Sequence, residues 1–206
     1  MKVLLINGSP NVNGSTATAL NEVAKTLNEE GIETEIITVG NKDIRGCIGC
    51  RKCFQAGKCV FDDYVNEAAP KFAEADGIVI GSPVYYANAN GTLVSFLDRL
   101  FYSTFFVDKS FKVGAAIASA RRGGQVATFD QLNKYFTISG MPIAGSQYWN
   151  MVYGNSAEEV KQDLEGMQTM RTLGKNMAFL IKSINLGKDQ IGLPEKERLT
   201  FTNFIR

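Results

Sequence analysis

Short apolar runs recur along the chain and predict β-strands. They are rich in valine and isoleucine, and the last is the weakest: Val3 to Ile6, Ile36 to Val39, Ile78 to Ile80, Val113 to Ile117 and Ile143 to Trp149. Because most of these runs are nearly continuous rather than alternating, they are typical of strands that are buried on both faces of a sheet.

Stretches with helical spacing of apolar residues separate these runs. The predicted helices cover residues 16–30, 63–75, 92–105 and 126–139, followed by a long one at 157–184. Strands that alternate with helices indicate a parallel sheet covered on both faces, because each crossover helix must pack back onto the sheet. Five strands fit a flavodoxin-like α/β three-layer sandwich with strand order 2-1-3-4-5, in which ligands bind at the loops after the first, third and fourth strands.

The length of the chain predicts a single domain. The 206 residues, 45% of them hydrophobic, suffice for one well-buried core. We expect a flavodoxin-like domain over residues 1–186, with a cysteine loop at 46–60 inserted after the second strand, and a polar tail over 187–206. The first apolar run is too short for a signal peptide or a membrane span, so a cytoplasmic location is expected.

Charge and composition narrow the function. The net charge of +1 gives no field that would attract nucleic acid or an anionic membrane. The absence of histidine excludes Ser-His-Asp and Cys-His nucleophiles. We therefore expect small-molecule chemistry that a cofactor carries, with no catalytic side chain acting as acid or base.

The loop after the first predicted strand is suited to an anion. Residues 7–18 are mostly small or hydroxyl-bearing and lead into a helix that Ser15 or Thr16 is expected to cap. The N–H groups of the first helical turn and the helix dipole favour a phosphate there. Both the G-x-G-x-x-G and the G-K-S/T patterns are missing, so the terminal phosphate of FMN fits better than a dinucleotide or a triphosphate. The alternative is an ordinary turn with a helix cap.

Two motifs together resemble a known family. Gly8-Ser9-Pro10 followed by Ser15-Thr16, together with the run from Gly81 to Tyr86, resembles the NADPH-dependent FMN reductase-like family of flavodoxin-fold proteins over about residues 1–150. The resemblance implies that the first loop holds the FMN phosphate through Ser9, Asn11, Asn13, Ser15 and Thr16. It also implies that the loop after the third strand contacts the isoalloxazine ring and ribityl chain through Pro83, Val84, Tyr85, Tyr86 and Asn88. Adjacent tyrosines suit this role, since each offers a flat apolar face with a hydroxyl.

The loop after the fourth predicted strand is expected to face the flavin from the other side. It contains Ser119, Arg121, Arg122, Gly123 and Gly124. Backbone amides at the glycines, or a cation from either arginine, would stabilise the negative charge of reduced FMN. The alternative is a tight turn with two solvated arginines.

All four cysteines fall in one short segment. Cys47, Cys50, Cys53 and Cys59 form a C-x2-C-x2-C-x5-C motif, with Arg45, Arg51, Lys52 and Lys58 nearby. Zinc sites usually use two C-x2-C pairs across a longer gap, whereas three cysteines at two-residue intervals favour a 4Fe–4S cluster. Zinc and metal-free thiols remain the alternatives.

This cysteine motif, on a flavodoxin-like domain, resembles the iron–sulfur flavoprotein family, in which FMN and a cluster exchange electrons. The last gap is longer than in the bacterial ferredoxin run, and Val60 replaces the proline that follows it. The resemblance implies an FMN-dependent oxidoreductase that receives electrons from NAD(P)H or ferredoxin. A cluster-free NAD(P)H-dependent FMN or quinone reductase is the first alternative. A flavodoxin-like electron carrier is the second, although such carriers are typically strongly acidic.

The helix predicted at 92–105 carries a wide apolar stripe that could serve both the core and a partner. Its residues are Leu93, Phe96, Leu97, Leu100, Phe101 and Phe105. The alternative is that the stripe serves the core alone. Together with the family resemblance, the stripe predicts a homodimer or homotetramer.

Overall fold

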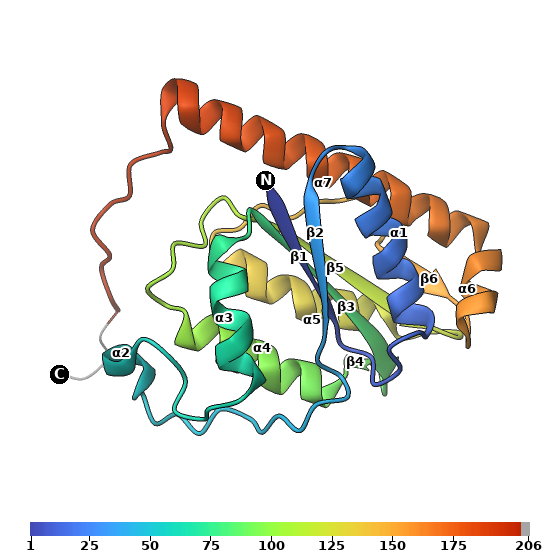
Figure 1. Cartoon of the computed structure of the whole chain (residues 1–206), viewed down its shortest axis with the longest axis horizontal. Helices are drawn as coiled ribbons and strands as arrows, with labels where there is room; N and C mark the ends of the chain where they lie inside the picture. Colours follow the sequence, from blue (N-terminus) through green and yellow to red (C-terminus); the bar gives the residue numbers. More distant parts are fainter. Residues whose placement is uncertain (203–206) are drawn as a thin grey trace.

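The computed structural model describes residues 1–202 and contains one central parallel sheet (Figure 1). Its strands are β1 (Lys2–Asn7), β2 (Glu33–Thr38), β3 (Gly77–Tyr85), β5 (Val113–Ala120) and β6 (Met151–Tyr153), in the order β2-β1-β3-β5-β6. A short strand, β4 (Asn88–Ala89), pairs antiparallel with the end of β3. The parallel strands have the flavodoxin-like order, which confirms the predicted fold, with β4 as an addition to it.

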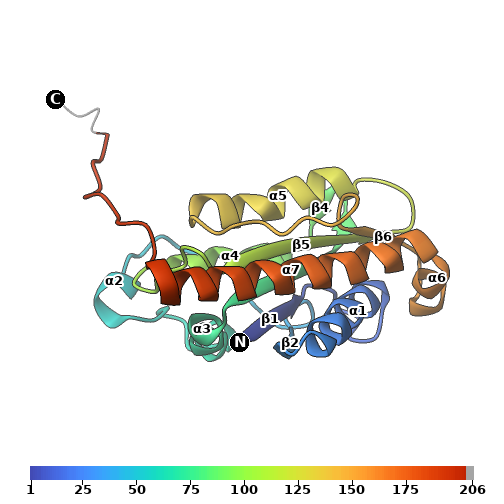
Figure 2. The same cartoon turned by 90° about the horizontal axis from the view of Figure 1, so that it is seen from above.

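Helices cover both faces of the sheet. One face packs on α1 (Ser15–Glu29) and α7 (Leu164–Ile191), and the other on α3 (Tyr64–Glu74), α4 (Gly91–Ser103) and α5 (Gln125–Ile138). Val3 and Leu5 of β1 enter the first core, whereas Leu4 and Ile6 enter the second. This alternation follows from the two-residue period of a strand and explains why β1 is apolar throughout. Figure 2 shows α7 running along the length of the molecule.

The fifth strand differs from the prediction. Only Ile143 of the expected strand at 143–149 forms a bridge, to Gly114, and the strand itself is β6 at Met151–Tyr153. The hydroxyl of Ser146 bonds to the Tyr148 carbonyl at 2.6 Å and to the Asn150 side chain at 2.7 Å. These local bonds replace the ladder and carry the chain away from the sheet before it returns.

The expected helix at 157–184 is two helices, α6 (Ala157–Gln162) and α7. Asp163 separates them, because its carboxylate accepts hydrogen bonds from the N–H groups of Gly166 and Tyr153 and caps α7. Helix α7 continues to Ile191, so the irregular tail begins at Gly192. Residues 203–206 of the expected tail lie outside the described part of the chain.

Helix α2 (Cys53–Ala56) is one short turn inside the cysteine loop that the sequence pattern did not predict. None of the helices in residues 1–202 combines the length and apolar character needed to cross a bilayer.

Candidate functional site

The loop after β1 is held by its own side chains. The Asn7 carboxamide accepts from the Ser9 N–H at 3.0 Å, the Ser9 hydroxyl from the Asn11 N–H at 3.1 Å, and the Asn11 carboxamide from the Asn13 N–H at 3.1 Å. Each bond closes a small side-chain turn of the kind that asparagine and serine favour. The side chains of Ser9 and Asn11 therefore shape the loop, and Ser9 is buried.

Helix α1 is capped differently from the prediction. Gly14 is its N-cap residue and provides no side chain, so the expectation that Ser15 or Thr16 caps the helix is wrong. The Ser15 hydroxyl instead donates to the Gly154 carbonyl at 3.2 Å, and the Thr16 hydroxyl pairs with that of Ser119 at 2.7 Å. Within residues 1–202, nothing accepts a hydrogen bond from the N–H groups of residues 15–17. These donors are free to bind an anion.

Two glycines allow the chain to pack closely under this loop. A Cβ atom on Gly40 would lie 2.2 Å from the Gly8 carbonyl oxygen and 2.3 Å from the Ser9 carbonyl carbon. A Cβ atom on Gly8 would lie 2.5 Å from a methyl group of Leu93. The backbone after β2 and the Leu93 side chain of α4 therefore fix the position of the loop after β1 by direct contact.

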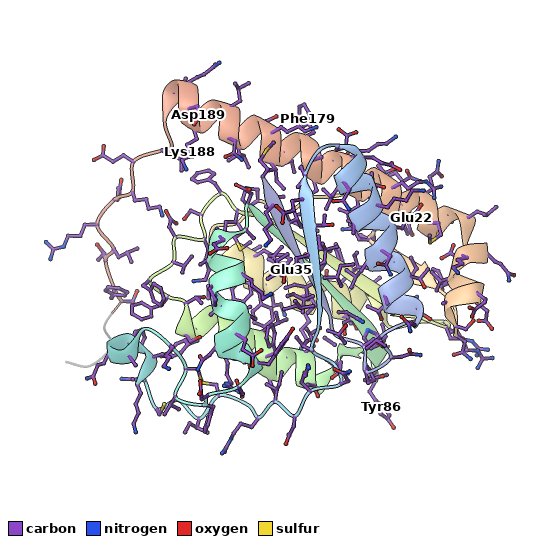
Figure 3. All side chains as sticks on the ribbon, viewed as in Figure 1. Glu22, Glu35, Tyr86, Phe179, Lys188 and Asp189 are labelled. Atoms are coloured by element: carbon purple, nitrogen blue, oxygen red, sulfur yellow. The ribbon has the colours of Figure 1, made fainter. Side chains whose placement is uncertain are left out.

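The end of β3 forms a tight hairpin with β4. Tyr85 pairs with Asn88, and the two residues between them, Tyr86 and Ala87, have φ values of 52° and 59°. Positive φ at both central residues is the geometry of a type I′ turn, which glycine and asparagine normally occupy. Tyr86 is fully exposed and projects away from the body of the protein (Figure 3), and Tyr85 is about half exposed. Backbone strain of this kind often marks a binding site.

The loop after β5 lies against this hairpin. Gly124 has φ 92° and is the N-cap residue of α5. A Cβ atom on Gly124 would lie 2.8 Å from a methyl group of Val84 and 3.0 Å from the Ala87 Cα. Arg121, Arg122 and Gly123 next to it are exposed.

The loops after β1, β3 and β5 therefore share one edge of the sheet. The structure brings the predicted residues of these loops together, with Ser9, Thr16 and Ser119 buried and Pro83 and Val84 half-buried. Asn11, Asn13, Tyr85, Tyr86 and Asn88 are exposed, and the Asn88 side chain donates to the Tyr86 carbonyl at 3.0 Å. Helices α1 and α5 both begin at this edge, and their dipoles favour a negatively charged ligand.

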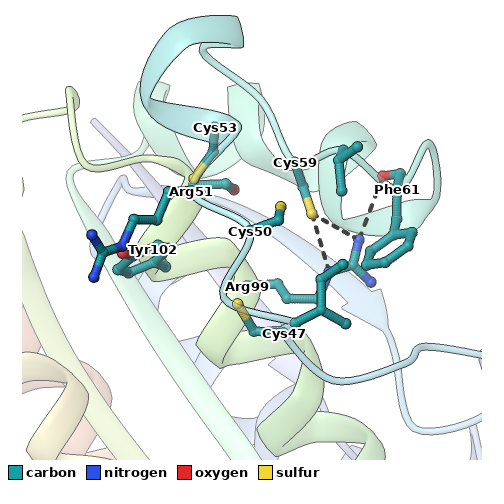
Figure 4. Close-up of a pocket in the computed structure, with 11 residues that line it drawn as sticks. Cys47, Cys50, Arg51, Cys53, Cys59, Phe61, Arg99 and Tyr102 are labelled. Carbon is teal, nitrogen blue, oxygen red and sulfur yellow. Dashed lines mark hydrogen bonds between the residues drawn. The ribbon is translucent and has the colours of Figure 1, made fainter.

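The four cysteines line one pocket (Figure 4). All are free thiols; Cys53 is buried, Cys59 is half-buried, and Cys47 and Cys50 are exposed. Burial raises the pKa of the Cys53 thiol. The four cysteine sulfurs do not converge on one point. Within residues 1–202, no three His, Cys, Asp or Glu side chains are grouped so as to hold a single metal ion.

Arg99 of α4 also lines the cysteine pocket, and sequence reasoning missed it. Its Nε and Nη2 atoms lie 3.3 and 3.2 Å from the Cys59 sulfur, and its side chain is 1% exposed. The available signal was a charged residue three positions after Phe96, on a helix whose other buried positions are mostly apolar. The four predicted cations of the cysteine loop are exposed, and of these only Arg51 lines the pocket.

Two further polar residues belong to this region. The Ser103 hydroxyl is buried, lines the pocket and has no hydrogen-bond partner within the described residues. Asn66 of α3 holds the backbone of the last cysteine, accepting from the Cys59 N–H at 2.9 Å and donating to the Cys59 and Phe61 carbonyls at 3.0 Å each.

Comparison with known proteins identifies the family. The family model described as NADPH-dependent FMN reductase matches residues 1–156. An iron–sulfur flavoprotein of Methanocaldococcus jannaschii is 38% identical over 191 residues, covering 89% of this chain and 99% of the relative. The chain belongs to the iron–sulfur flavoproteins of the NADPH-dependent FMN reductase family. A second iron–sulfur flavoprotein, from Methanosarcina thermophila, is 30% identical over 92% of this chain and 100% of its own length.

Solved structures agree with the fold of this iron–sulfur flavoprotein. RosB, crystallised with 8-demethyl-8-formylriboflavin-5'-phosphate, has a TM-score of 0.72 at 17% identity and covers 100% of this chain and 94% of its own. An archaeal flavodoxin has a TM-score of 0.61 at 15% identity over 88% of this chain and 99% of its own. Family membership makes the protein an FMN-binding oxidoreductase, which confirms that part of the sequence-based interpretation.

Proposed function

We propose that this protein carries FMN at the loops after β1, β3 and β5 and a 4Fe–4S cluster on Cys47, Cys50, Cys53 and Cys59. It transfers electrons between NAD(P)H or ferredoxin and an acceptor through these two groups. The observation that carries the proposal is the shared pocket of all four cysteines, in a chain that belongs to the iron–sulfur flavoproteins.

The residues of the pocket fit a cluster better than a single ion. In a 4Fe–4S cluster each thiolate binds a different iron, so the four sulfurs surround a volume instead of converging on a point. The pocket also offers the buried, unpartnered hydroxyl of Ser103 and the guanidinium of Arg99. Such donors suit the sulfur atoms of an anionic cluster.

The FMN site is supplied mainly by backbone groups. The free N–H groups of residues 15–17 would bind the phosphate, while Pro83, Val84 and the two tyrosines contact the ring and the ribityl chain. Asn11, Asn13, Asn88, Arg121, Arg122 and Gly123 complete the exposed rim. FMN, when bound, supplies the redox chemistry, because it can take up two electrons and release them singly. The chain positions the ring and stabilises its negative charge.

Helix α4 connects the two proposed sites. Its N-cap residue, Asn90, bonds to the Ser82 hydroxyl at 3.0 Å beside the flavin edge, and Arg99 lines the cysteine pocket. Nine residues of helix span about 14 Å. One rigid element therefore holds both sites within a single protomer.

Metal analysis with rapid mixing tests the proposal. Anaerobically purified protein should contain about one FMN, four iron and four sulfide per chain. The protein is then mixed separately with NADH, NADPH and reduced ferredoxin. The physiological donor should bleach the flavin absorbance first and reduce the cluster afterwards. Protein with FMN but without iron that NADPH reduces would be a cluster-free reductase, and stoichiometric zinc would also contradict the cluster.

A homodimer or homotetramer is part of the proposal. Exposed aromatic residues flank the cysteine pocket. Phe54 packs edge-on against Tyr102 and Phe105, with 5.3 Å and 4.5 Å between the ring centroids. Exposed aromatic clusters mark interaction surfaces. Light scattering of the holoprotein should give a mass of two or four chains, and Phe54→Ser should lower it.

A further inference from the structure

Arg99 is a buried cation whose donors are all engaged. Its side chain is 1% exposed and forms a two-pronged ion pair with Asp63, at 2.7 Å from Nη1 and 2.8 Å from Nη2. Nη1 also donates to the Arg45 carbonyl at 3.3 Å, and Nη2 to the Phe61 carbonyl at 3.4 Å. A buried charge is costly unless it is paired and fully hydrogen-bonded, so these contacts fix the guanidinium in one orientation.

That orientation directs two nitrogens at one sulfur. Nε and Nη2 both donate to Cys59, and the dashed lines of Figure 4 show the two bonds converging. Within residues 1–202, no side chain donates to Cys47, Cys50 or Cys53; Cys47 accepts only from the Gly49 N–H at 3.5 Å. The four cysteines are therefore electrostatically unequal, and the cation acts on Cys59.

We propose that Arg99 is a positioning residue that raises the reduction potential of the cluster through its two hydrogen bonds to Cys59, while Asp63 limits that effect. This inference rests on the proposed cluster. If reduced FMN supplied one electron to the cluster, no bond would break and the cluster would gain one negative charge. N–H donors to a ligand sulfur withdraw electron density and stabilise that added charge. The Asp63 carboxylate partly cancels the positive charge of Arg99, so the two residues have opposite effects on the potential.

Two variants with opposite expected signs test the inference. Arg99→Gln removes the cation and should shift the cluster potential downward in an EPR-monitored redox titration. Asp63→Asn leaves the guanidinium without its counter-charge and should shift the potential upward. Asparagine keeps the N-cap of α3 that Asp63 provides through the Val65 N–H. Arg99→Lys keeps the charge and should give a potential between that of Arg99→Gln and that of the wild type.

Arg45→Gln is the matched control. Arg45 is an exposed cation just before the cysteine loop; its guanidinium carbon lies 4.7 Å from the centroid of the Phe61 ring, and its side chain has no bond to a sulfur in the described residues. The Arg45→Gln variant should leave the reduction potential of the cluster nearly unchanged. Equal shifts for Arg45→Gln and Arg99→Gln would mean that any nearby positive charge, and not the hydrogen bonds to Cys59, sets the potential. That result would overturn the inference. Shifts of the same sign in Arg99→Gln and Asp63→Asn, as a purely structural role predicts, would also overturn it.

A measurement on the wild type covers the case in which Arg99→Gln loses its iron. In protein with isotopically labelled arginine, the reduced cluster should show hyperfine coupling to an arginine nitrogen. A cluster without that coupling overturns the inference while the proposed function stands. Wild-type protein with no iron overturns both, so the two failures are distinguishable.

Discussion

The loop after β1 and the loop after β2 both serve as candidate cofactor sites, but they are stabilised in opposite ways. Residues 7–13 form their own turns, in which asparagine and serine side chains accept hydrogen bonds from N–H groups two residues further along the chain. The cysteine loop depends on distant residues: Asn66 of α3 and Arg99 of α4 hold Cys59, while Cys47 and Cys50 are exposed.

This difference shows which interactions fix the conformation of each loop. The loop after β1, which we propose binds the FMN phosphate and call the phosphate loop, is shaped by local hydrogen bonds and by close packing at Gly8 and Gly40, so its conformation does not depend on a ligand. The cysteine loop is fixed at its last cysteine and open at its first two, so a bound cluster would complete its folding. The two sites should therefore respond independently to substitutions.

Cys59→Ser should give the largest effect of these variants, a loss of iron from the protein. It removes the one thiol that the protein holds in place through both its backbone and its sulfur. Iron should fall from about four per chain to less than one, while FMN content stays near one per chain. Metal and flavin analysis of anaerobic preparations measures both. Loss of FMN together with iron would show that the sites are not independent.

Gly40→Ala should weaken FMN binding at the loop after β1. The added methyl group would collide with the backbone of Gly8 and Ser9, and overpacking of this kind costs about 1–3 kcal/mol. We expect FMN affinity to fall about tenfold, equivalent to about 1.4 kcal/mol, with iron content unchanged. Flavin fluorescence titration gives the affinity. Gly145→Ala, where a Cβ meets open space, is the matched control.

The same contrast explains what the sequence could predict. The phosphate loop, the hairpin loop and the strand order follow from local patterns, so β1, β3 and β5 and their loops lie where the apolar runs place them. Three details were not predicted, because they depend on individual side-chain hydrogen bonds that an apolar pattern does not encode: Gly14 as the N-cap residue of α1, the shift of the last strand to β6, and the break at Asp163. Arg99 was missed because a buried arginine and a solvated one look alike in a sequence, and only the fold brings α4 to Cys59.

Asn66→Ala should loosen the cysteine loop by an intermediate amount. It removes three hydrogen bonds to the backbone of Cys59 and Phe61 and should lower the free energy of unfolding by about 2 kcal/mol. Reconstitution with iron and sulfide should become slower, with FMN affinity unchanged. Asn66→Asp keeps the acceptor for the Cys59 N–H but sets a carboxylate oxygen against the Cys59 and Phe61 carbonyls, so it should destabilise the loop at least as much as the alanine variant. A drop in FMN affinity would contradict the independence of the two loops.

The smallest effect concerns the buried hydroxyl pair of Thr16 and Ser119. Each single variant, Thr16→Val or Ser119→Ala, leaves one buried hydroxyl without its partner and should cost about 1 kcal/mol of unfolding free energy. The double variant removes both groups and should cost less than the sum of the two, which a double-mutant cycle measures. Because the Thr16 hydroxyl is bonded to Ser119, we expect the phosphate to be bound by the free N–H groups of α1, and Thr16→Val should weaken FMN binding less than Gly40→Ala does. The reverse order would mean that FMN displaces Ser119 from Thr16, and that the phosphate loop rearranges on binding instead of being ready for it.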